Sequence, residues 1–125
     1  MTPPLPAGGS DPEVELYGRP TASELLVAAR EFLANEVMPA TEGHVQFHTR
    51  VTLRVLDTVL REMDLGPRHL EEHGHRLADL GYGSDWELVE AIRRGVFDDR
   101  ISELAGRLEP DVRAKLEVSD PRYID

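Results

Sequence analysis

The chain has 125 residues, no cysteine and a formal net charge of −10, from 24 acidic and 14 basic side chains. Its length suits one domain with one hydrophobic core. The lack of cysteine excludes thiol nucleophiles and thiolate metal sites, and the negative charge disfavours nucleic acid and anionic lipid as partners. No basic segment followed by an apolar run opens the chain, and no run approaches the roughly 18 apolar residues of a membrane span, so we expect a cytoplasmic protein.

The first 18 residues contain four prolines and three glycines and show no apolar period, which predicts a flexible tail over 1–18. A helix should follow, because Thr21 and Glu24 have the spacing of a capping box. Apolar residues then recur at helical spacing. We expect Pro39 to end this helix, since the residue before a proline is pushed out of the α region.

The stretch 43–65 has no interior glycine or proline and predicts a long central helix of roughly 33 Å. At 100° per residue, one broad apolar face should be core, and the opposite face should meet solvent. The core face holds Val51, Thr52, Val55, Leu56, Val59, Leu60 and Met63; the solvent face holds Arg50, Arg54, Asp57 and Arg61. Gly66 and Pro67 should end this helix, and the helix expected over 68–80 should turn back on it.

Beyond Gly81 the pattern predicts further helices. Ser84 and Glu87 form a second capping box, and Gly95 should end the helix that they start. The next helical segment should begin near Asp98, and Pro110 should kink it or divide it into two.

No stretch alternates as a strand would, so we predict an all-α fold, a compact bundle of five or six helices around the long central helix. The helical domain should span 19–119, with a tail at 120–125.

Five histidines suggest a metal site, because His44 and His48, like His69 and His73, are spaced to share a helix side. In the expected hairpin the two pairs would lie roughly 16 Å apart, too far to share one ion. A separate site could form from His69, Glu72, His73 and His75, but these residues more often make a hydrated helix surface, and we predict no metal and no cofactor.

His48 falls on the apolar face of the central helix. We interpret it as a neutral core histidine with a hydrogen-bond partner; the alternative is a role at a pocket or a partner surface.

The arginines at 50, 54 and 61 are the main local concentration of positive charge. The simpler interpretation is a solvated face with helical ion pairs to Asp57. The functional interpretation is a surface that contacts an anion or a partner, since arginine recognises carboxylate and phosphate with two parallel hydrogen bonds. No phosphate-binding loop, dinucleotide fingerprint or nucleophile elbow occurs, so we predict a protein that is not an enzyme.

Three segments resemble a family of small bacterial domains of unknown function. They are RPTASELLVAAREFLANEVMPA at 19–40, EGHVQFHTRVTLRVLDTVLREMDLGP at 42–67 and VRAKLEVSDPRYI at 112–124. The residues that match the family pattern are Phe47, His48, Arg50, Val51, Lys115, Leu116, Pro121, Arg122 and Tyr123. This chain has Leu53 and Arg54 where the family tends to have a small residue and then asparagine, which weakens any polar role built on that asparagine.

The resemblance implies a function in acyl-CoA metabolism. Members are encoded beside aminoglycoside-phosphotransferase-like kinases and acyl-CoA dehydrogenases, which implies a non-catalytic accessory subunit that stabilises or activates such a kinase. The dehydrogenase is a second candidate partner, and a homodimer through the long helix is compatible with both. The residues expected to bind the partner are Phe47, His48, Arg50, Arg54, Arg61, Arg122 and Tyr123. The alternative is a small helical protein that uses His48 to bind a metal or another ligand.

Overall fold

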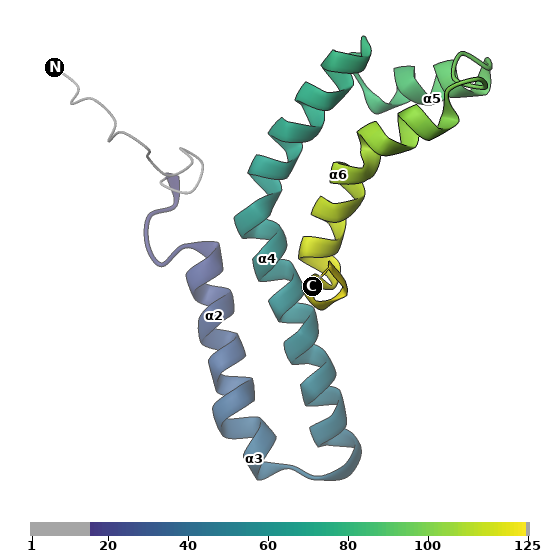
Figure 1. The fold of residues 1–125 in the computed structure, drawn as a ribbon. Helices are drawn as coiled ribbons and strands as arrows, with labels where there is room; N and C mark the ends of the chain where they lie inside the picture. The colour runs from purple at the N-terminus through teal and green to yellow at the C-terminus, as the bar shows by residue number, and fades with distance from the viewer. Residues whose placement is uncertain (1–15, 125) are drawn as a thin grey trace, which may run out of the picture. The chain divides into compact units, whose positions relative to one another are not determined.

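The computed structural model describes residues 16–124, so most of the predicted N-terminal tail lies outside the described residues. Within that range the regular structure is helical and contains no strand, which confirms the all-α class. The elements are α2 (Ala22–Phe32), a π-helical segment η1 (Leu33–Val37), α3 (Met38–Ala40), α4 (Gly43–Leu80), α5 (Asp85–Arg93), α6 (Ile101–Ser119) and a final 3-10 turn η2 (Pro121–Ile124) (Figure 1). The chain divides into two compact units with their boundary between Leu60 and Arg61.

Residues 16–124 contain four helices, counting the continuous stretch from α2 through η1 to α3 as one, so the prediction of five or six is wrong. The difference comes from prolines that we expected to break helices and that the folded chain keeps inside them. No helix in this range is long and apolar enough to cross a membrane.

The capping box at the start of α2 is confirmed. The Glu24 N–H donates to Thr21 Oγ1 over 3.2 Å, and the Thr21 N–H donates to Glu24 Oε1 over 3.0 Å. The Arg19 guanidinium donates to the same carboxylate at 2.9 Å. The hydrogen bond from Arg19, followed by that from the Thr21 backbone, lowers the pKa of Glu24 to about 2. This carboxylate therefore stays ionised at the positive end of the helix dipole.

Pro39 does not end the first helix, contrary to our prediction. The chain widens into the π-helical segment η1, where the Met38 N–H donates to the Leu33 carbonyl five residues back. Helical structure continues to Ala40. The Gln46 side chain donates to the carbonyls of Met38 at 3.0 Å and Thr41 at 2.9 Å, so α4 supplies donors that the end of this helix lacks.

Helix α4 starts at Gly43 as predicted but continues through Gly66 and Pro67 to Leu80. The predicted hairpin between 43–65 and 68–80 is therefore wrong. A proline inside a helix costs about 3 kcal/mol, because it removes one backbone donor and crowds the preceding turn. Contacts of the following turns with α5 and α6 offset this cost. Tertiary packing therefore outweighs the helix-stop signal of Gly66 and Pro67.

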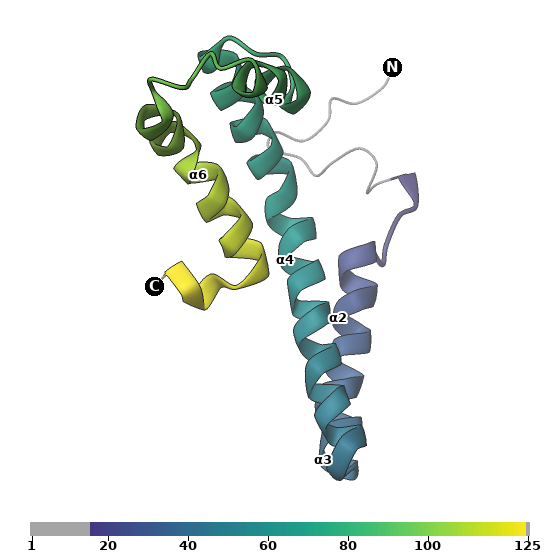
Figure 2. The same ribbon diagram turned by 90° about the vertical axis from the view of Figure 1, so that its right-hand side faces the viewer.

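In the first unit, α2 runs antiparallel to the N-terminal part of α4 (Figures 1 and 2). The Arg30 guanidinium of α2 forms an ion pair with Asp57 of α4 through both carboxylate oxygens. Thr49 is the buried polar residue of α4, and its hydroxyl donates to the Val45 carbonyl. Asp57 therefore lies on the covered side of α4, and its prediction as a solvent-facing residue is wrong.

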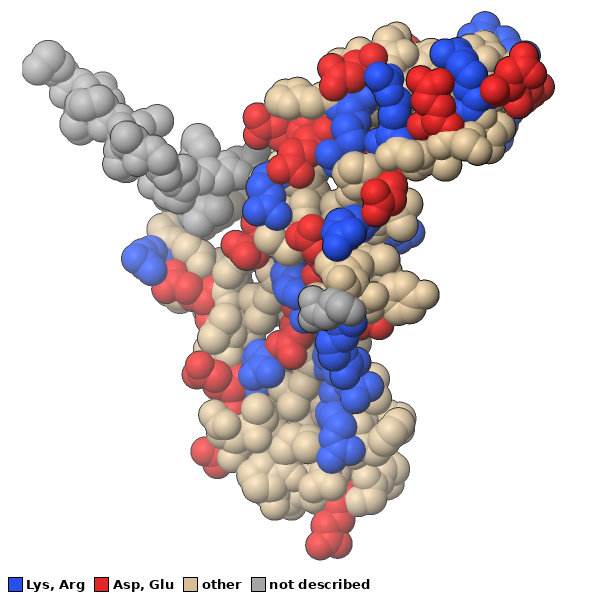
Figure 3. All heavy atoms as spheres, in the orientation of Figure 1, with Lys and Arg blue, Asp and Glu red and all other residues tan. Residues whose placement is uncertain are grey.

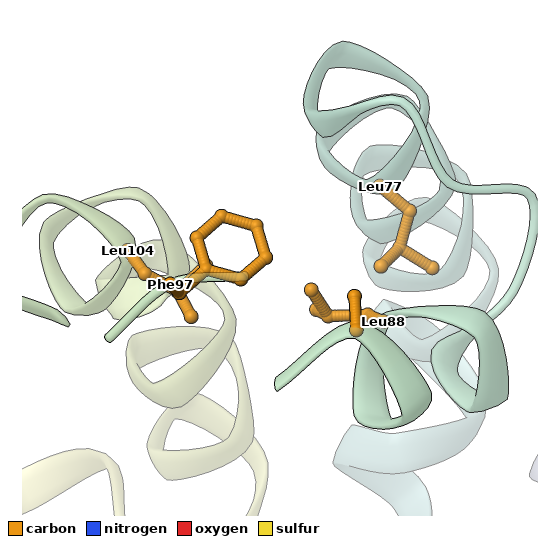
Figure 4. Packing of buried hydrophobic residues seen from close by; sticks show 5 residues of the cluster. Leu77, Leu88, Phe97 and Leu104 are labelled. Atoms are coloured by element: carbon orange, nitrogen blue, oxygen red, sulfur yellow. The ribbon is translucent and has the colours of Figure 1, made fainter. Parts of the chain in front are cut away.

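In the second unit, buried side chains from α4, α5, the following turn and α6 form one core (Figure 4). It consists of Leu77, Leu88, Ala91, Phe97 and Leu104, with Leu80, Tyr82 and Leu108 packed against it. Ser84 caps α5 as predicted, accepting the Glu87 N–H at 3.2 Å, although the Glu87 carboxylate accepts from Gly83 instead of completing the box. Gly95 follows the end of α5 with φ 85°, as predicted.

Helix α6 begins at Ile101, slightly later than predicted, and Pro110 lies inside it without dividing it. The last residues were predicted to be an extended tail. Those that the structure describes instead form the 3-10 turn η2, in which the Tyr123 N–H donates to the Asp120 carbonyl at 3.0 Å.

Candidate functional site

Four apolar side chains of α4 in the first unit are exposed: Val45, which is 44% exposed, and three others that share one side of the helix. The three that share a side are Phe47, Val51 and Val55, which are 57%, 40% and 55% exposed. Because they are four residues apart, they lie on one side of the helix and span roughly 12 Å along it. We call these three residues the open stripe. Val51 and Val55 were predicted to be core, and that prediction is wrong.

The open stripe lies on the far side of α4 from the residues that are covered. At 100° per residue, Leu53 and Leu60 are about 160° and about 180° around the helix from Val51. Both leucines are half-buried. This part of α4 therefore carries apolar side chains on two opposite faces, and only one of the two is packed. A surface helix of a self-sufficient domain normally shows a single apolar stripe.

Two arginines, Arg50 and Arg54, border the open stripe. Both are exposed, and within residues 16–124 neither guanidinium forms an ion pair or a side-chain hydrogen bond. At 100° per residue, Arg54 lies about 20° from Phe47 around the helix axis. Figure 3 shows basic side chains over α4 amid largely uncharged surface. The result is an apolar strip with a cationic edge.

His48 is exposed, so its prediction as a buried core histidine is wrong. Its ring meets the Phe47 ring edge to face, with the ring centroids 5.4 Å apart and an interplanar angle of 77°. The His48 imidazole therefore lies at the surface beside the Phe47 end of the open stripe. Its exposure fits the alternative interpretation, a role at a partner surface.

The other three predicted partner-binding residues belong to the second unit. Arg61 is half-buried and donates from Nε to the Val118 carbonyl at 2.8 Å, near the C-terminal end of α6. Such a contact satisfies one of the carbonyls that a helix end leaves free. Arg122 Nε lies 3.8 Å from Asp120 Oδ1. The Tyr123 side chain is exposed.

A network that sequence reasoning missed joins α4, α5 and α6. The His73 ring lies between two carboxylates, with Nε2 2.6 Å from Asp85 Oδ1 and Nδ1 2.9 Å from Asp111 Oδ1. Arg76 donates to the same Asp111 oxygen from Nε at 3.0 Å and from Nη2 at 2.7 Å. The partners lie on three helices, and no local motif marks them.

The network changes the proton affinity of its members. Burial alone would lower the pKa of His73, but the hydrogen bonds to Asp85 and Asp111 outweigh it and raise that pKa. Burial opposes ionisation of Asp111, but the hydrogen bonds from Arg76 and His73 lower its pKa. Both shifts favour the charged forms of these groups. Asp111 Oδ2 is buried and has no hydrogen-bond partner among the described residues.

An open groove of about 550 Å³ lies beside this network, between α4 and α6. It is lined by Glu62, Gly66, His69, Leu70, His73, Asp111, Ala114, Lys115, Val118 and Ser119. His69 Nε2 lies 3.4 Å from Glu117 Oε2. Over residues 16–124, no three histidine or carboxylate side chains converge as metal ligands would. Of the candidate metal set, His73 already uses both ring nitrogens, so the four residues form no ready site.

Comparison with known proteins places the chain in one family. No curated protein and no solved structure matches it. A family described as Domain of unknown function (DUF6285) matches residues 39–123, a range that includes α4, α5 and α6. Because this match covers more than half of the chain, the protein belongs to that family of domains of unknown function.

Proposed function

We propose that this protein is a non-catalytic helical subunit that binds and stabilises an aminoglycoside-phosphotransferase-like kinase acting in acyl-CoA metabolism. The observation that carries the proposal is the open stripe, an apolar face of α4 opposite the face that is covered. The kind of partner follows from the resemblance of residues 19–124 to domains encoded beside such kinases.

The energetics support a binding role. Burying apolar surface releases about 25 cal/mol of free energy for each Å² removed from water. A helix with two apolar faces obtains this stabilisation on both faces only when a second surface covers the open one. Phenylalanine and arginine are also enriched where proteins meet. Phe47 and the neighbouring Arg50 thus supply the residue types of an interface centre.

The ionisable groups with shifted pKa values have structural partners, which supports a structural role for these groups. Glu24 is engaged in a cap, and His73 and Asp111 hold helices together. In an active site such groups would be expected to face a substrate cleft. His73 and Asp111 do line the groove between α4 and α6, but both are engaged in ion pairs that join helices.

The test is co-expression of the untagged chain with the tagged kinase-like protein, followed by size-exclusion chromatography and a kinase assay on hydroxyacyl-CoA with and without the chain. We expect one complex and a gain in kinase activity or half-life. Phe47→Ser should weaken the complex at least about 10-fold, as expected for an interface centre. Phe32→Ser is the matched control, because Phe32 lies on α2 and is 59% exposed. Separate peaks for the wild-type chain and the kinase would contradict the proposal.

A second candidate function is binding of a small ligand or metal in the groove between α4 and α6. The observation in its favour is the mainly apolar lining next to His69 and Lys115. Metal analysis of protein purified without a histidine tag tests the metal version, which requires a stoichiometric ion.

A further inference from the structure

We infer that the partner covers the open stripe with an amphipathic helix that carries two carboxylates one turn apart, and that these carboxylates pair with Arg50 and Arg54. This inference rests on the proposed function, because it describes the surface of the same partner. It adds the chemistry by which that partner is recognised.

The charge of the surface favours an acidic partner over an uncharged or basic one. Arg54 lies almost in line with Phe47 and next to Val55 in the sequence, so a surface that covers the whole open stripe also removes water from the Arg54 guanidinium. Burying a cation without a counter-charge is costly, and among residues 16–124 neither Arg50 nor Arg54 has an ion-pair partner. The partner must therefore supply the anions.

The contrast with the covered face supports the same conclusion. Where α2 packs on α4, the Arg30 guanidinium that becomes half-buried is paired with Asp57 through both carboxylate oxygens. On the covered face, the Asp57 carboxylate of α4 thus offsets the cost of desolvating the Arg30 guanidinium of α2. Among the residues that the structure describes, Arg50 and Arg54 lie beside the open stripe and no carboxylate is paired with them.

Spacing defines the partner further. Arg50 and Arg54 are four residues apart, so their attachment points are separated by roughly 6 Å along α4. Two carboxylates on successive turns of a helix packed along α4 have the same separation. Arginine favours such carboxylates because its planar group donates two parallel hydrogen bonds. An acidic helix with an apolar face is therefore the fitting occupant.

The net charge of the chain sets the conditions for this contact. With a net charge of −10, the chain as a whole repels an acidic partner, so attraction must come from the local pair of arginines at short range. Salt screens the long-range repulsion between the two proteins, because charges more than roughly 10 Å apart interact little in salt. It weakens the attraction within a desolvated ion pair much less. The apolar stripe anchors the contact, and the arginines select its charge.

The experiment measures binding of the kinase-like protein to the full-length chain by calorimetry at low salt and at high salt. Arg50→Glu with Arg54→Glu should weaken binding roughly 10- to 100-fold, the size expected when charges that face partner carboxylates are reversed. The control is Arg94→Glu with Arg107→Glu, which makes the same change in net charge at two exposed arginines of the second unit. We expect the control to change affinity less than about threefold.

The outcomes separate this inference from the function on which it rests. If Phe47→Ser abolishes binding while reversal of the two arginines leaves it unchanged, the subunit role stands and the acidic helix is refuted. If the wild-type chain does not bind the kinase at low salt, both are refuted.

A second measurement asks what covers the open stripe. The chain has no cysteine, so Val51→Cys introduces a unique thiol. We expect this thiol to react rapidly in the free chain and at least about 10-fold more slowly in the complex, while Val112→Cys, in an exposed position of α6, stays reactive in both. Slow labelling of Val51→Cys in the free monomer, or protection that grows with chain concentration, would show that the chain or a second copy covers the stripe and would overturn the inference.

Discussion

His73 joins two carboxylates from different helices through its two ring nitrogens, Nε2 to Asp85 of α5 and Nδ1 to Asp111 of α6. Only the protonated imidazole has two N–H donors, so the arrangement favours the cation. Because Arg76 donates to the same Asp111 oxygen, each charge in this network has an opposite charge beside it. The second unit is therefore held together by polar contacts as well as by its apolar core.

The stability of the protein should depend on pH through His73. Its pKa is raised above the ordinary value of about 6.5, so the folded state binds the proton more tightly than the unfolded state. The stabilisation is complete below about pH 6.5 and is lost as the pH rises through the folded-state pKa. We expect the free energy of unfolding, from urea denaturation, to be lower at pH 8 than at pH 6. His73→Gln should remove this difference and cost about 1–3 kcal/mol at pH 6.

His75→Gln is the control for that experiment. His75 is an exposed histidine on the same helix. His75→Gln should leave the pH dependence of the free energy of unfolding intact. If His73→Gln and His75→Gln reduced this pH dependence equally, the assignment to His73 would be contradicted.

Truncation of a core side chain should be far more costly than truncation of an exposed one. Leu104 is buried in the same cluster as Phe97 and Leu77, so Leu104→Ala should lower the free energy of unfolding by about 2–5 kcal/mol. Leu70 is exposed on α4, and Leu70→Ala should change it by less than about 0.5 kcal/mol. Similar losses for the two variants would show that the core is elsewhere.

Substitutions at 66 and 67 test whether α4 is continuous. A β-carbon added at Gly66 meets no atom within 4 Å, so Gly66→Ala should stabilise the protein by about 0.5–1 kcal/mol. Pro67→Ala should restore a helical donor and add about 1–3 kcal/mol. If the chain turned at these residues, both changes would destabilise it, and Cα chemical shifts would lose their helical values near residue 66.

The ion pair between Arg30 and Asp57 should couple α2 to α4. Both side chains are about one third exposed, so a double-mutant cycle with Arg30→Met and Asp57→Asn should give a coupling energy of about 0.5–1 kcal/mol. The more exposed pair of Arg19 and Glu24 provides a comparison in which we expect a smaller coupling. A coupling of zero for Arg30 and Asp57 would mean that packing alone holds α2 in place.

Some features that depend on neighbouring residues were predictable from the sequence, although the helix ends predicted at Pro39 and at Gly66 and Pro67 were not among them. The caps at Thr21 and Ser84 and the helix end at Gly95 need only a few adjacent residues, and the structure confirms all three. The all-α class follows from the same local periodicity.

Features that depend on distant residues were not predictable. Residues 43–60 carry apolar side chains at both Val51 and Leu53, and only the packing of α2 decides which face is covered. In the same way, the carboxylates of Asp85 and Asp111 reach His73 from other helices. The candidate surface at Phe47 and Arg50 was chosen by family resemblance, and its exposure emerged only in the folded chain.

The central claim is that the open stripe binds a kinase-like partner. Its most direct test is a side-by-side co-purification of the tagged kinase with the wild-type chain, Phe47→Ser and Phe32→Ser, all checked for folding by circular dichroism. We predict that the wild-type chain and Phe32→Ser co-elute with the kinase and that Phe47→Ser does not. Equal recovery of all three chains, or recovery of none, would contradict the claim.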